Sequence, residues 1–77
     1  MDNIAEKVKD IFVRSFHLDP GEITQEAGLK ADLDMDSTEI VELVTDLEKE
    51  FSIKIEDREI TTQHNVGDVI EIVKGKL

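Results

Sequence analysis

The sequence contains no cysteine, few basic residues and no long apolar run, and each absence limits what the chain can be. Without cysteine, neither disulfides nor thiolate metal sites can stabilise its 77 residues, a length at which a single hydrophobic core is close to marginal. No apolar stretch is as long as a membrane span or has the pattern of a signal peptide. We therefore expect one soluble domain over residues 1–77, cytoplasmic, monomeric and not inserted in a membrane.

The scarcity of basic residues makes charge the most informative property of the composition. Nine Lys and Arg residues face nineteen Asp and Glu residues, which leaves a net charge of −10. A chain this acidic repels nucleic-acid phosphates, which argues against nucleic acid as a partner, and attracts basic protein surfaces. Residues 32–50 contain eight acidic residues and one lysine, and so hold −7 of the total. Because such a block repels itself in the folded state, it indicates a docking surface.

Apolar residues spaced three and four apart predict a first helix over residues 3–16. Asn3 or Asp2 can cap its start, and Pro20 with Gly21 ends the helical pattern.

Two further helices have marked starts. Asp36 and Glu39 have the form of a capping box, so a second helix begins after Asp36. Asn65 can cap a last helix, which Gly75 closes. The second helix carries the core stripe of the chain: Ile40, Leu43, Val44, Leu47 and Phe51.

The connecting segments show no clear period. Residues 18–35 contain three apolar anchors, at Ile23, Leu29 and Leu33, which predict a loop packed on the core with one short helical turn. Residues 52–55 alternate like a strand but have no partner strand, and residues 57–60 predict a short helix. The expected fold is an all-α bundle of three main helices and one short helix, with a long packed loop between helices one and two.

Ser37 stands where a functional group is expected. As the first residue of the second helix it lies at the positive end of the helix dipole, beside unpaired N–H groups, where a phosphate binds well. Serine is also common at helix starts for purely local hydrogen bonding. Behind it a solvent face is predicted, with one apolar member, Val41, between Ser37, Thr45 and Glu48.

Two other readings of this segment fail on the sequence. A nucleophilic serine needs a base, and neither His17 nor His64 has a context that marks it as one, so we expect no enzymatic activity. A calcium loop starting at Asp32 would need glycine at its sixth position and glutamate at its twelfth. Ser37 and Leu43 stand there instead, and we expect no metal site.

The segment "DLDMDSTEIVELVTDLEKEFSIKI", with "ITT" and a final amphipathic helix, resembles the acyl carrier proteins. The resemblance extends over nearly the whole chain. It implies that a phosphopantetheinyl transferase attaches 4′-phosphopantetheine from coenzyme A to Ser37, and that Asp36 takes part in recognition by this transferase. The thiol of the arm would then carry acyl groups as thioesters, which explains how a chain without cysteine can do thioester chemistry.

The acidic second helix and the resemblance together predict the partner residues. Acyl-loading and acyl-using enzymes with basic patches would dock on the second helix, at Thr38, Glu39, Val41, Glu42, Thr45, Asp46 and Glu48. The cargo residues follow from physical reasoning instead: the bundle could part between helices two and three to admit an acyl chain among Ile40, Val44, Leu47, Ile55, Ile60 and Ile70.

Two residues depart from the family pattern. Thr38 stands where leucine is usual and Thr45 where methionine is frequent, and both changes remove apolar contact area. We therefore expect a specialised carrier rather than the general carrier of fatty-acid synthesis. A peptidyl or aminoacyl carrier, or an unmodified acidic helical docking module, remains the alternative; the acidity and the "DMDS" segment favour acyl cargo.

Overall fold

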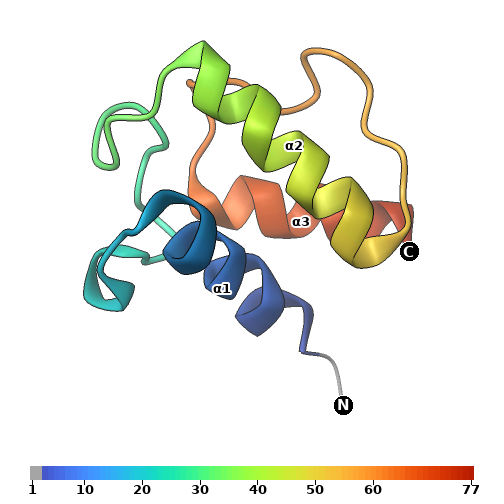
Figure 1. Ribbon diagram of the computed structural model, residues 1–77, viewed down its shortest axis with the longest axis horizontal. Coiled ribbons are helices and arrows are strands. Elements are labelled where there is room, and N and C mark those ends of the chain that lie inside the picture. Colours follow the sequence, from blue (N-terminus) through green and yellow to red (C-terminus); the bar gives the residue numbers. More distant parts are fainter. Residues whose placement is uncertain (1–2) are drawn as a thin grey trace.

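The computed structural model describes residues 3–77, which form three α-helices and one short 3₁₀ helix (Figure 1). They are α1 (Ile4–Phe16), η1 (Pro20–Glu22), α2 (Ser37–Phe51) and α3 (Val66–Lys76). The described residues contain no β-strand, only one isolated bridge between Gly28 and Asn65. The predicted all-α fold is therefore confirmed. None of these helices is long and apolar enough to cross a membrane.

Helix α1 forms because its apolar residues fall on one face, where Val8, Ile11 and Phe12 are buried. It ends at His17, whose left-handed backbone (φ 57°) stops the helical hydrogen-bond ladder. Asn3 occupies the cap position without a side-chain hydrogen bond, and Asp2, the other predicted cap, lies outside the described residues.

Helices α2 and α3 both begin with the predicted capping residues. Asp36 and Asn65 each accept a hydrogen bond from the N–H three residues later, and the side chain of that residue bonds back. The prediction that Gly75 closes the last helix is wrong, because α3 continues through it to Lys76. A single glycine lowers helix propensity without ending a helix that is packed on a core.

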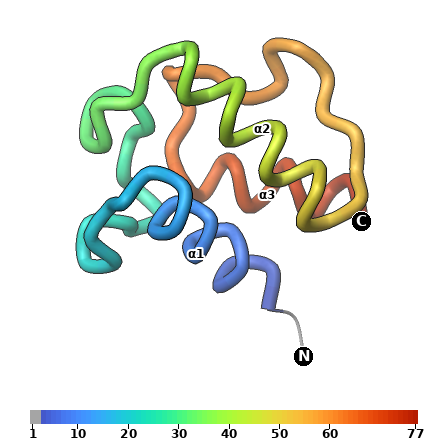
Figure 2. Tube along the Cα trace, in the orientation of Figure 1, coloured from blue at the N-terminus to red at the C-terminus, as the bar shows by residue number. Residues whose placement is uncertain are grey.

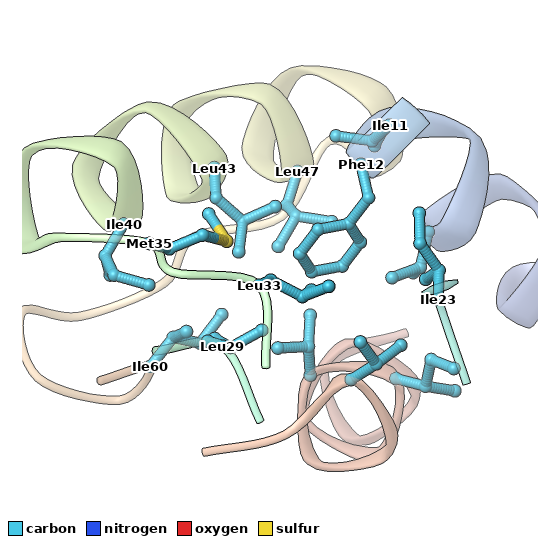
Figure 3. Packing of buried hydrophobic residues seen from close by; sticks show 14 of the residues in the cluster. Ile11, Phe12, Ile23, Leu29, Leu33, Met35, Ile40, Leu43, Leu47 and Ile60 are labelled. Atoms are coloured by element: carbon cyan, nitrogen blue, oxygen red, sulfur yellow. The ribbon is translucent and has the colours of Figure 1, made fainter. Parts of the chain in front are cut away.

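The long loop before α2 is part of the core. Its three predicted anchors, Ile23, Leu29 and Leu33, are buried against α1 and α2, as Figure 3 shows. Met35 and Ala27 are buried as well, which the sequence pattern did not indicate. The expected short helical turn in this loop is η1.

The loop after α2 corrects the prediction of a short helix at residues 57–60. These residues form a turn, in which the Glu59 N–H donates to the Glu56 carbonyl (3.2 Å) and the Glu56 N–H donates to Glu59 Oε2 (2.7 Å). Arg58 has a φ of 74°, which a right-handed helix does not allow. After this turn the chain runs back beside the start of α2 (Figures 1 and 2), so residues 57–62 lie near Ser37.

Candidate functional site

Ser37 is the first residue of α2 and is exposed. The capping box fixes the backbone on which it stands: Asp36 Oδ1 accepts the Glu39 N–H (2.9 Å), and Glu39 Oε1 accepts the Asp36 N–H (3.2 Å). The Ser37 hydroxyl is therefore accessible, but its position is set by a well-defined helix start.

The first turn of α2 keeps two unused donors. The N–H groups of Ser37 and Thr38 have no hydrogen-bond partner within residues 3–77, whereas those of Glu39 and Ile40 bond to Asp36. Unpaired N–H groups at the positive end of a helix dipole favour a bound anion. A phosphate joined to Ser37 fits this donor set.

An open groove lies beside Ser37, with a volume of about 490 Å³ and a mainly apolar lining. On the α2 side Ile40 and Val41 line it together with Ser37. The other side is the returning loop, which contributes Asp57, Arg58, Ile60, Thr61 and Thr62. A slender, partly apolar group attached to Ser37 can lie along this groove.

The structure brings together only two of the six predicted cargo residues, Ile40 and Ile60, in this groove. Leu47 and Ile55 are buried in the core, and Val44 is half-buried. Ile70 lies on α3 and lines a different hollow, together with Ala5 and Lys74.

The outer face of α2 carries most of the predicted partner residues. Thr38, Val41, Glu42 and Thr45 are exposed, and Val41 has 66% of its surface accessible. The Thr45 hydroxyl donates a hydrogen bond to the Val41 carbonyl (3.0 Å). The hydroxyl proton of Thr45 is therefore used within the helix. Thr38 and Thr45, the two departures from the family pattern, thus lie on the face predicted to dock.

Two predicted partner residues have structural roles that the sequence did not reveal. Asp46 Oδ2 accepts a hydrogen bond from the Ser15 hydroxyl of α1 (2.6 Å). Glu48 Oε2 accepts the Ile55 N–H of the following loop (2.8 Å). The first bond joins residues 31 apart and the second joins α2 to the loop that follows it, seven residues on, so helical spacing contained no sign of either. A docking role for these acids remains a prediction.

The acidic residues before Ser37 do not converge. Asp32 Oδ2 accepts the Gly28 N–H (2.6 Å), which closes a turn of the long loop. Over residues 3–77, no three Asp, Glu or His side chains gather so that they could hold a metal ion. His64 forms a hydrogen bond within its own loop: its Nδ1 accepts the Thr61 N–H (2.9 Å) in the segment that lines the groove.

The turn at residues 57–60, on the loop side of the groove, is bonded to the end of α3. Lys76 Nζ donates to Glu59 Oε2 (2.8 Å), and both side chains are mostly shielded from solvent. This bond, with the N–H of Glu56, lowers the pKa of the Glu59 carboxyl below its ordinary value. Sequence reasoning missed Asp57, Arg58, Thr61 and Thr62 as groove residues, since no periodic pattern shows that a loop returns to the start of α2.

Comparison with known proteins agrees with this geometry. Residues 6–73 match the family described as "Phosphopantetheine attachment site". The acyl carrier protein of Thermotoga maritima is 37% identical over 76 residues, which covers 99% of this chain and 94% of the relative. The acyl carrier protein of Petrotoga mobilis is 38% identical over 76 residues, covering 99% of this chain and 89% of the relative. The chain therefore belongs to the acyl carrier protein family, and it is a carrier with covalently attached 4′-phosphopantetheine rather than an enzyme.

Proposed function

We propose that Ser37 is the residue to which 4′-phosphopantetheine is attached, and that the protein presents acyl groups from this position to partner enzymes. The observation that carries the proposal is the exposed Ser37 hydroxyl on a capped helix start with two unused N–H donors. When bound, the group supplies the thiol that forms acyl thioesters, which this chain without cysteine lacks.

The attachment step uses the hydroxyl and the helix start. Ser37 Oγ attacks the phosphorus next to the pantetheine in the pyrophosphate of coenzyme A. A new O–P bond forms, the pyrophosphate P–O bond breaks, 3′,5′-adenosine diphosphate leaves, and the serine proton goes to a base on the transferase. The N–H groups of Ser37 and Thr38 stabilise the negative charge on the phosphate that Ser37 acquires.

The docking surface in this proposal is the exposed face of α2. Val41 gives it an apolar centre, and Glu42 and Glu39 lie beside it in the most acidic part of the sequence. Basic patches on the transferase and on acyl-loading and acyl-using enzymes are complementary to this surface. We propose that the protein acts as a monomer in the cytoplasm and that Thr38 and Thr45 make it a specialised carrier.

The mainly apolar groove beside Ser37 favours acyl cargo over aminoacyl or peptidyl cargo. Burial of an acyl chain against Ile40, Val41 and Ile60 would contribute up to about 0.8 kcal/mol for each methylene. The intact mass of the protein purified from its native cell would identify the cargo, and an amino acid on the arm would contradict this assignment.

The test of attachment is the mass of the chain after incubation with coenzyme A and a phosphopantetheinyl transferase. We expect a gain of one phosphopantetheinyl group, which Ser37→Ala abolishes. The matched control is Ser52→Gly, at the other end of α2, where a φ of 54° suits glycine and modification should be unaffected. Labelling that survives Ser37→Ala would refute the assignment.

A further inference from the structure

We propose that Arg58 binds the phosphate on Ser37 and so holds the pantetheine arm along the apolar groove. This inference rests on the proposed attachment at Ser37. Arg58 lines the groove from the side of the returning loop, and it is the only cationic residue in that lining. It is exposed and forms no hydrogen bond or ion pair within residues 3–77, so the fold itself does not use its charge.

The charges around Ser37 disfavour a bound phosphate, so a nearby cation would stabilise the bound arm. Residues 32–50 hold eight acidic side chains, and a phosphate on Ser37 adds another negative charge beside them. Lys49 lies twelve residues along α2, a helical rise of about 18 Å from Ser37. Since the Debye length is about 8 Å at physiological ionic strength, Lys49 is screened from the phosphate. Arg58 is the cation of the groove lining, which also contains one acidic residue, Asp57.

The backbone at Arg58 shows that the fold holds this residue in an unfavourable conformation. Its φ of 74° is uncommon outside glycine, asparagine and aspartate, and such conformations persist only when surrounding contacts enforce them. Here the enforcing contacts are the paired hydrogen bonds between Glu56 and Glu59 and the bond from Lys76 to Glu59. These bonds support the turn that places Arg58 in the groove lining.

The chemistry suits arginine. A guanidinium group can give two parallel N–H bonds to phosphate oxygens, which a lysine ammonium cannot. The N–H groups of Ser37 and Thr38 would bind the same phosphate from the helix side. With Ile60 and Val41 in the same lining, the pantoyl methyl groups next to the phosphate then meet apolar side chains.

The experiment uses the protein carrying the arm and compares the wild type with Arg58→Gln, Arg58→Gly and Arg58→Lys. The readouts are the ³¹P chemical shift and the nuclear Overhauser contacts between the pantoyl methyl protons and the methyl groups of Ile60 and Val41. Arg58→Gly matters because glycine accepts the left-handed backbone, so a loss in that variant cannot come from strain. The matched control is Lys54→Gln, an equal change of charge at an exposed residue of the same loop outside the groove lining.

We expect Arg58→Gln and Arg58→Gly to lower the population of arm in the groove about two- to fivefold, the range of an exposed charge pair. Arg58→Lys should keep part of the population and Lys54→Gln all of it, and added salt should weaken the contacts only where a cation is present at residue 58. Unchanged contacts in Arg58→Gln would overturn this inference while leaving the proposed function intact. A chain that takes no arm at Ser37 would overturn both.

Discussion

Helices α2 and α3 begin with the same local arrangement, yet only the start of α2 leaves donors for a ligand. Each has a complete capping box, from Asp36 in α2 and from Asn65 in α3. At α3 the first two N–H groups are already used, since Val66 donates to the Ala27 carbonyl (3.0 Å) and Gly67 to the Gln25 carbonyl (2.9 Å). The corresponding N–H groups of α2 have no partner in residues 3–77.

The difference comes from the loop that packs on each first turn. The long loop covers the start of α3 so closely that Val66 has no exposed surface. The loop after α2 instead leaves an open groove beside Ser37. A capping box therefore specifies where a helix begins, and the neighbouring loop decides whether that beginning is part of the core or can bind an anion.

The largest expected effect is a difference in the free energy of unfolding between two valine-to-alanine variants, one at Val66 of α3 and one at Val41 of α2. Val66→Ala should lower the free energy of unfolding by about 2 kcal/mol, because the valine is fully buried and its removal leaves a cavity. Val41→Ala should change it by less than about 0.5 kcal/mol, since Val41 is largely exposed. Urea denaturation followed by circular dichroism measures both.

Binding to the transferase should show the opposite order. Val41→Ala should weaken it by about 1 kcal/mol, roughly fivefold in Kd, through lost apolar contact. Folded Val66→Ala should bind like the wild type in isothermal titration. Equal stability losses in the two variants would remove the contrast between a buried and an available helix start.

The second prediction compares substitutions of the two capping residues, Asn65 and Asp36. Asn65→Ala should cost about 1 kcal/mol of stability and leave phosphopantetheinylation of the folded protein unchanged, because that cap serves only the helix. Asp36→Asn should keep the cap, since an asparagine oxygen accepts the same Glu39 N–H, but should slow the modification by removing the charge. Unfolding curves and the rate of mass gain together test this pair.

Asn65→Asp is the control, which preserves the α3 cap with a charge and should be as stable as the wild type within a few tenths of a kcal/mol. A normal modification rate in Asp36→Asn would mean that Asp36 acts only as a cap.

The parts of this molecule that the sequence predicts are those determined by near neighbours in the chain. Both capping boxes involve residues three apart, and the stripe of α2 repeats every three to four residues, so both starts and the buried face could be inferred. The place of Ser37 as the first residue of α2 follows from the same local pattern. The anchors Ile23 and Leu33 were recognisable as isolated apolar residues in a polar loop.

The remaining features depend on contacts between distant segments. The bond from Ser15 to Asp46 spans 31 residues, and that from Lys76 to Glu59 spans 17. At residues 57–60 a turn stands in place of the predicted helix, because Arg58 has a positive φ that a right-handed helix does not allow. No periodicity in the sequence contains this information, and so the loop side of the groove could not be predicted.

The smallest expected effect concerns the contact between Glu59 and Lys76, which joins this loop to the end of α3. Glu59 has its pKa lowered from an ordinary value of 4.5, first by the hydrogen bond from Lys76 and then by that from Glu56. Because the folded protein binds this proton more weakly than the unfolded chain, the carboxylate stabilises the fold above the ordinary pKa, and the contribution is lost as the pH falls through the lowered pKa. Glu59→Gln should therefore lower the urea midpoint slightly at pH 7, and the gap from the wild type should narrow as the pH falls below 4.5.

Glu56→Gln supplies the control, since it makes the same chemical change in the same turn while keeping the backbone N–H that bonds to Glu59. A gap between Glu59→Gln and the wild type that stays constant with pH would show that the carboxylate charge does not hold the turn. If the stability gap between Glu59→Gln and the wild type narrows at low pH, the ionised Glu59 carboxylate holds the loop side of the groove to the end of α3. The first two N–H groups of α3 bond to backbone carbonyls, which do not titrate, so protonation of Glu59 should leave those two bonds unchanged.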